Sequence, residues 1–166
     1  MQIARALGSG LAGAAAVTAV NEIARRAIPN APRLEVLGMR ALAATLRAAG
    51  RPVPDHDMLF YETLAGDLLS NALYYSQVGL GDRRGAWRRG ALLGLAAGLG
   101  AALLPPKLGL GHQPAERTPA TQIMTAAWYV IGGLAAAAAA QLLPASEDDW
   151  DAASQPALAR GDGEGI

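Results

Sequence analysis

Polar side chains recur along the otherwise apolar segment "YETLAGDLLSNALYYSQVG", residues 61–79. Four of them follow one another at spacings that share one side of a helix: Asp67, Ser70, Asn71 and Tyr74. A carboxylate in the middle of a membrane span costs about 2.5–3.5 kcal/mol on insertion scales unless it is paired, protonated or hydrated. Two interpretations of Asp67 follow: a proton- or cation-binding group that faces a polar path, or a hydrogen-bonded group that fixes helix packing.

Charged residues gather at the end of the first apolar segment, in "TAVNEIARRAIP", residues 18–29. Glu22 precedes Arg25 and Arg26 by one helical turn, an arrangement that favours ion pairs. Glu62 opens the next apolar segment, at the same face of the membrane. We therefore expect Glu22, Arg25, Arg26 and Glu62 to form a charge cluster there; the alternative is a local ion pair at a solvated helix end.

The two histidines are weak candidates for metal binding. His56 lies in "PDHD" and His112 in "GLGHQP", and the two connectors that hold them emerge on one side of a four-span protein. With Asp55 and Asp57 they offer ligands suited to Zn, Mn or Fe, but no HExxH spacing is present, and either aspartate is suited to cap a helix. Cysteine is absent, which excludes thiolate ligands and nucleophiles. We expect no metal and no cofactor.

Glycines recur every four residues in "GALLGLAAG". Gly90, Gly94 and Gly98 make two overlapping GxxxG units, which let helix backbones approach closely in membranes. The pattern does not choose between packing within one chain and packing between two chains.

The elements that position these residues are predicted to be helices. Apolar stretches long enough to cross a bilayer lie near residues 6–25, 58–79, 87–104 and 122–143. Between the first two, residues 33–50 place Arg33, Arg40 and Arg47 on one side and apolar residues on the other, which is typical of an interfacial amphipathic helix. The sequence predicts an all-α integral membrane protein with a four-helix transmembrane domain, residues 1–144, and a disordered acidic tail, residues 145–166.

Composition agrees with a membrane environment. Of 166 residues, 52% are hydrophobic and 17% are charged, against about 25% charged in soluble domains. The formal net charge is zero and Lys107 is the only lysine, so the composition gives no sign of a nucleic-acid partner. The expected partner is the lipid bilayer, taken to be a bacterial inner membrane. The four arginines at positions 83, 84, 88 and 89 favour both termini in the cytoplasm, although the arginine-rich first connector competes.

Two functions are consistent with these patterns. The first is a non-catalytic helix-packing module that self-associates or joins a larger membrane complex, which the glycine and alanine surfaces favour. The alternative is a small transporter or ion- or proton-conducting protein that uses Asp67. An intramembrane enzyme would depend on the histidine and aspartate set alone, so we expect no catalytic activity.

Overall fold

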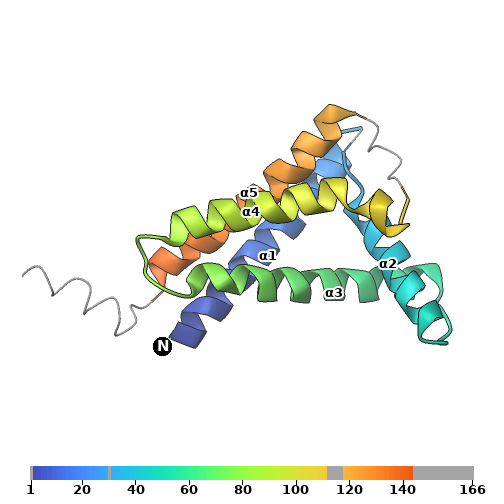
Figure 1. The fold of residues 1–166 in the computed structure, drawn as a ribbon, viewed down its shortest axis with the longest axis horizontal. Coiled ribbons are helices and arrows are strands. Elements are labelled where there is room, and N and C mark those ends of the chain that lie inside the picture. Colours follow the sequence, from blue (N-terminus) through green and yellow to red (C-terminus); the bar gives the residue numbers. More distant parts are fainter. Residues whose placement is uncertain (1, 30, 112–117, 144–166) are drawn as a thin grey trace, which may run out of the picture.

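The computed structural model describes residues 2–29, 31–111 and 118–143, and in these residues every regular element is a helix. The α-helices are α1 (Gln2–Ala27), α2 (Leu34–Ala48), α3 (His56–Ser76), α4 (Ala86–Leu103) and α5 (Pro119–Leu142) (Figure 1). Two short 3-10 helices follow α3 and α4: η1 (Gln77–Gly79) and η2 (Pro105–Leu108). The all-α prediction is confirmed. His112 and the tail predicted to be disordered lie outside the described residues.

Two helices begin at side-chain caps that the sequence indicates. The Asp55 carboxylate accepts a hydrogen bond from the Met58 N–H at 3.0 Å, at the start of α3. The Thr118 hydroxyl accepts one from the Thr121 N–H at 3.3 Å, and Pro119 occupies the first turn of α5. Each cap satisfies a backbone donor that has no partner within the helix, which fixes where the helix starts.

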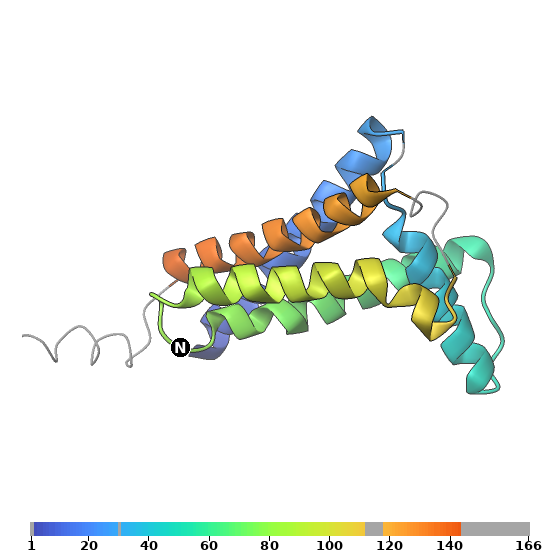
Figure 2. The ribbon, with the colours of Figure 1, turned by 45° about the horizontal axis from the view of Figure 1, so that its top comes forward.

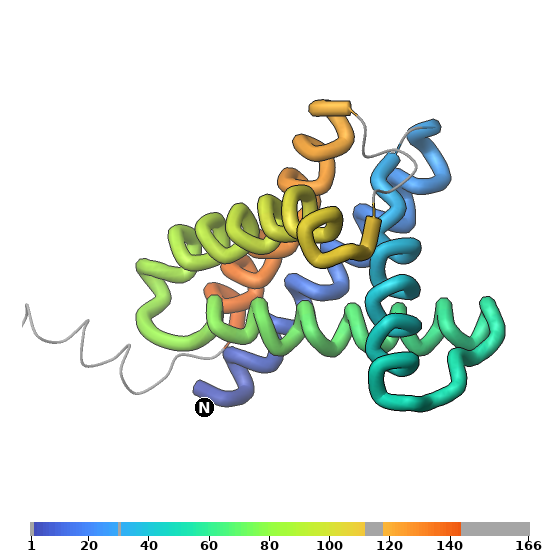
Figure 3. Tube along the Cα trace, turned by 45° about the vertical axis from the view of Figure 1, so that its right-hand side comes forward, coloured from blue at the N-terminus to red at the C-terminus, as the bar shows by residue number. Residues whose placement is uncertain are grey.

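The long helices pack side by side in the order α4, α5, α1, α3. Helices α3 and α4 meet at their connector and then diverge, as Figures 1 and 3 both show. Helix α2 packs on the N-terminal half of α3 and stands across it in Figure 3. The arrangement is therefore an open layer of four helices with α2 at one end.

Helices α4 and α5 approach closely along the repeated glycines (Figure 2). A Cβ atom at Gly94 would lie 2.6 Å from the Tyr129 carbonyl oxygen, and one at Gly98 would lie 2.6 Å from the Cα atom of Ala126. A Cβ atom at Gly90 would meet the carbonyl of Gly133. The glycine face of α4 is therefore covered by α5 of the same chain.

The buried core consists mostly of small residues. Its central cluster joins all four long helices and contains Val17, Tyr75, Val78, Ala86, Ala136, Ala137 and Ala140. The Tyr75 hydroxyl donates to the Tyr129 carbonyl at 2.6 Å, and the Tyr74 hydroxyl donates to the Leu93 carbonyl at 2.9 Å. Two neighbouring tyrosines thus tie α3 to α5 and to α4 near the point where α3 and α4 diverge.

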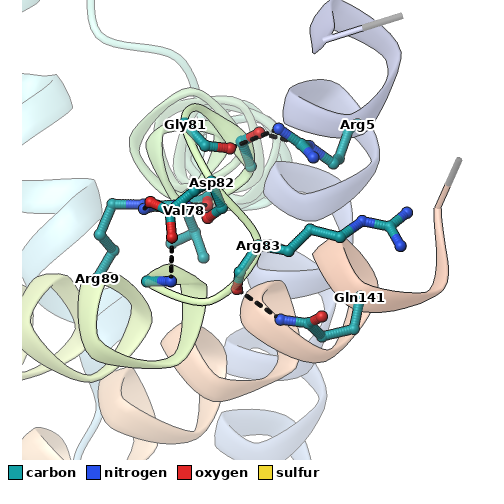
Figure 4. A network of polar contacts seen from close by, with 9 residues as sticks. Arg5, Val78, Gly81, Asp82, Arg83, Arg89 and Gln141 are labelled. Atoms are coloured by element: carbon teal, nitrogen blue, oxygen red, sulfur yellow. Dashed lines mark hydrogen bonds and ion pairs between the residues drawn. The ribbon is translucent and has the colours of Figure 1, made fainter. Parts of the chain in front are cut away.

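Three helices hold the connector between α3 and α4 in place (Figure 4). Arg5 of α1 is only 2% exposed, and its guanidinium donates to the Gly79 carbonyl at 2.9 Å and to the Gly81 carbonyl at 2.5 Å. Gln141 of α5 donates to the Arg83 carbonyl at 2.7 Å. These bonds satisfy carbonyls that no regular element pairs, as buried backbone groups require.

Arg89 of α4 closes the same connector from the other side. Its guanidinium donates to the backbone carbonyls of Val78 at 3.1 Å and Asp82 at 2.7 Å, and it pairs with the Asp82 carboxylate at 3.2 Å. The Gly85 N–H, which donates to that carboxylate at 2.7 Å, and the nearby Arg89 charge hold the pKa of Asp82 below its usual range. Part of the arginine cluster at positions 83–89 is thus used by the fold itself.

In the part of the chain that the structure describes, α1 and α5 have the length and apolar character needed to cross a membrane. Helices α3 and α4 do not reach the same standard. Asp57, Glu62 and Asp67 interrupt the apolar sequence of α3, and α4 begins with Arg88 and Arg89 in its first turn.

Replacing Gly94 by alanine should destabilise the protein, because the added methyl group would press on the backbone of Tyr129 and Val130. We expect a loss of about 1–3 kcal/mol, the usual effect of overpacking, seen as a lower melting temperature in detergent. Gly100→Ala, on the same helix, is the matched control: its Cβ atom would meet only Leu104, at 3.6 Å. Equal melting temperatures for the two variants would contradict the packing described for α4 and α5.

Replacing Arg5 by methionine should loosen the connector between α3 and α4. The change removes two buried hydrogen bonds from a charged donor and leaves two carbonyls unpaired, which should cost about 3 kcal/mol. Hydrogen exchange at residues 79–85 should accelerate, and the melting temperature should fall. Arg84→Met, which alters an exposed arginine of the same connector, should change neither quantity; a comparable effect of both substitutions would argue against a specific role of Arg5.

Candidate functional site

A polar cleft, partly open to solvent, lies where α1, α2 and α3 meet, with a cavity volume of about 60 Å³. From α1 it is lined by Val17, Thr18, Asn21, Glu22 and Arg25. From α2 it is lined by Leu34, Glu35 and Gly38. From α3 it is lined by Phe60, Thr63, Leu64 and Asp67. A water molecule needs about 10–15 Å³ of such space, so the cleft has room for several waters or for one small ligand.

Helical periodicity explains why these side chains face one space. Residues 60, 63, 64 and 67 of α3 follow the spacing of a single helix face, and so do residues 17, 18, 21, 22 and 25 of α1. Gly38 allows α2 to come close to α3, since a Cβ atom there would lie 2.5 Å from the Thr63 methyl group. The cleft therefore requires the approach of α2 as well as the two polar faces.

The three carboxylates of the cleft differ in their ionic partners. Glu22 pairs with Arg25 at 2.7 Å and with Arg26 at 2.6 Å. Within the described residues, neither Glu35 nor Asp67 forms an ion pair, although Glu35 is half-buried and Asp67 lies at the exposed rim. The lining therefore has two more acidic than basic side chains. Such a site attracts cations.

Several oxygen atoms in the wall of the cleft are shielded from water and have no hydrogen-bond partner. They are Thr18 Oγ1, Asn21 Oδ1, Glu35 Oε2 and Thr63 Oγ1. Buried polar atoms are nearly always paired in proteins, and leaving one unpaired costs about 1–3 kcal/mol. Thr63 is itself buried, with only 8% of its surface exposed. This concentration of unsatisfied acceptors marks the cleft as a place for a hydrogen-bond donor.

The polar face predicted on α3 divides among three environments. Asp67 lines the cleft, and Ser70 donates to the Asp67 backbone carbonyl at 3.0 Å. Asn71 is buried, and its Nδ2 atom has no partner. Tyr74 contacts α4 through its bond to Leu93. The structure thus brings only Asp67 of this set into the cleft.

The predicted charge cluster is brought together in part. Glu22, Arg25 and Arg26 form ion pairs, whereas Glu62 is exposed on α3 and has no ionic partner among the described residues. The reason is the orientation of α3, whose residues 60, 63, 64 and 67 face Arg25 across the cleft. At about 100° per residue, Glu62 lies on the opposite face of this helix (α3 is labelled in Figure 1, and Figure 3 shows α2 across it).

The structure gives the histidines no metal site within its described residues. His56 is exposed, with its Nδ1 atom 3.3 Å from the Asp57 carboxylate, and Asp55 is used as a helix cap. Across residues 2–29, 31–111 and 118–143, no three histidine, aspartate or glutamate side chains gather as metal ligands. His112 lies outside these ranges.

Glu35 is the cleft residue that the sequence patterns do not single out. It is the only acid in a helix that otherwise carries arginines, but it sits in the first helical turn, where acidic residues commonly stabilise the helix dipole. Its place in the sequence therefore indicates only this ordinary role, and not its position beside α1 and α3.

Comparison with protein families, with curated proteins and with solved structures finds no match to this chain. The chemistry assigned to the cleft rests on its geometry.

Replacing Thr63 by valine should stabilise the protein by up to about 1 kcal/mol, because the change removes a buried hydroxyl that has no partner. The matched control is Thr125→Val, since the Thr125 hydroxyl donates to the Thr121 carbonyl at 3.0 Å in a buried position. We expect Thr125→Val to lower the melting temperature or leave it unchanged. A larger loss of stability for Thr63→Val than for Thr125→Val would contradict the assignment of Thr63 as unsatisfied.

Proposed function

We propose that this chain is an integral membrane protein in which α1, α3, α4 and α5 cross the bilayer and the arginine-bearing helix α2 lies at one interface. Length and apolar character alone suit the core helices of soluble proteins as well, so the distribution of residue sizes carries the argument. Small residues fill the core, while large apolar side chains are exposed on all four long helices: Leu7, Leu11, Leu69, Leu73, Leu92 and Ile123. Water disfavours such a surface and lipid accepts it.

The proposed location is a bacterial inner membrane with both termini in the cytoplasm. The connector between α3 and α4 lies at the same end of the molecule as the N-terminus of α1 (Figures 1 and 2). Trp87 and the exposed arginines 84 and 88 near this connector are typical of a cytoplasmic interface. Arg40, from the competing connector, donates to the Leu110 carbonyl at 3.1 Å, so that arginine has a role in the fold.

We further propose that the cleft binds a cation and takes part in its passage through the membrane. The observation that supports this function is the pair of carboxylates, Glu35 and Asp67, that share one cleft without an ionic partner among the described residues. Ionisable groups within membrane proteins are expensive, and they commonly mark ion or substrate pathways. Glu22 is neutralised by Arg25 and Arg26, which leaves the other two carboxylates to bind the cation.

A second candidate is a helix-packing module that self-associates or joins a larger membrane subunit. The glycine face of α4 no longer supports it, because α5 covers that face. Support comes instead from the large apolar side chains that α3 exposes, among them Leu68, Leu69 and Leu73. The mass of the protein in nanodiscs tests this alternative, since a module of this kind should form a defined oligomer.

Charge movement across a supported membrane tests the transport function. Proteoliposomes should give a current after a concentration jump in at least one of protons, potassium or a short-chain alkylammonium ion. Asp67→Asn and Glu35→Gln should each lower that current about tenfold, equivalent to the loss of ~1.4 kcal/mol of binding.

The matched control is Glu62→Gln, which removes a carboxylate from α3 outside the cleft and should leave the current unchanged. A wild-type protein that gives no current with any of the three cations would contradict the transport function. So would an equal effect of Glu62→Gln and Asp67→Asn.

A further inference from the structure

The unpaired polar atoms that line the cleft are all oxygens. They therefore restrict the hydrogen-bonding groups of a ligand as well as its charge. Glu35 Oε2 accepts hydrogen bonds and donates none, and hydroxyl oxygens accept as readily as they donate. A ligand that satisfies several such atoms must present several donors in one place. A protonated primary amine does this, since its nitrogen carries three N–H groups and one positive charge.

The size and the apolar part of the lining indicate what is attached to that nitrogen. The cavity volume of about 60 Å³ exceeds the roughly 10–15 Å³ that a single water needs, so the cleft holds more than a bare ion. Val17, Leu34, Phe60 and Leu64 supply an apolar surface beside the polar atoms. Within the described residues no three acidic or histidine side chains gather as metal ligands, which disfavours a divalent ion in the cleft. The phenyl ring of Phe60 also suits a cation held near its face.

We propose that the ligand of the cleft is a small organic primary ammonium compound with an apolar body. Its three N–H groups donate to the oxygens of Glu35, Thr63 and Asn21, the Asp67 carboxylate at the rim adds a second negative charge, and its carbon chain packs against Phe60 and Leu64. The proposal rests on the cation-binding function of the same cleft, and it adds the requirement for N–H donors. The Glu22 carboxylate keeps its pairing with Arg25 and Arg26.

Equilibrium binding to the full chain in detergent tests this inference, with two probes that share charge and chain length. The probe n-butylammonium carries three N–H donors, whereas n-butyltrimethylammonium carries none. We expect the first to bind at least about tenfold more tightly than the second in calorimetric titrations, because only the first can satisfy the oxygens of the cleft. Equal affinities, or no binding of n-butylammonium, would overturn the proposal.

Variants locate the binding. Glu35→Gln should weaken n-butylammonium binding about tenfold, and Thr63→Val should weaken it severalfold while raising the melting temperature. The control Glu62→Gln should bind as the wild type does; an effect equal to that of Glu35→Gln would show binding to acidic surface alone and would overturn the site.

The two proposals for the cleft fail separately. A proton or potassium current that needs Asp67, without any binding of n-butylammonium, would overturn the amine ligand and leave transport standing. Binding of n-butylammonium with no current from any cation would overturn transport and leave the amine site standing.

Discussion

The rest of the structure depends on the close approach of the α4, α5 and α1 backbones. Gly90 and Gly94 of α4 meet Gly133 and Tyr129 of α5, and a Cβ atom at Gly132 of α5 would lie 3.0 Å from the Gly13 carbonyl oxygen of α1. In the proposed membrane location, dispersion between closely packed backbones takes the place of the hydrophobic effect, because lipid tails solvate leucine as well as a protein core does. The requirement for close backbone packing therefore accounts both for the small residues in the core and for the leucines on the outer surface.

The same constraint explains where polar chemistry can be placed. Helices α4, α5 and α1 leave little room between them, whereas α3 contacts α1 on one side and diverges from α4. The space beside α3 is filled in part by α2, a short helix that brings Glu35 to the carboxylates of the neighbouring helices. The cleft forms at the edge of the tightly packed layer, where α1, α2 and α3 leave space between them. Its unpaired oxygens lower the stability of the fold, and the close glycine contacts between the other helices offset that loss.

Much of the local structure can be predicted from the sequence, because it depends on residues that are close together in the chain. Thr118 before Pro119 specifies a helix start, Asp55 specifies another, and the spacing of Gly90, Gly94 and Gly98 specifies a packing face. The candidate site is harder to predict from the sequence, because it depends on how three helices meet. The polar face of α3 is visible as a pattern, yet only Asp67 of that pattern reaches the cleft. Glu35 has an ordinary position in its own helix, and its role follows only from the crossing of α2 over α3.

The bonds of Arg5 have a consequence for the order of assembly. Its guanidinium lies in the second turn of the chain, and its carbonyl partners lie more than seventy residues later. During synthesis α1 is made before those carbonyls exist, so water, or lipid phosphate in the proposed membrane location, must solvate Arg5 in the interval. The connector between α3 and α4 reaches its final form only when that solvation is exchanged for the bonds to Gly79 and Gly81. Burial of Arg5 is therefore a late event in assembly, and this end of α1 reaches its final contacts only after the connector between α3 and α4 has been made.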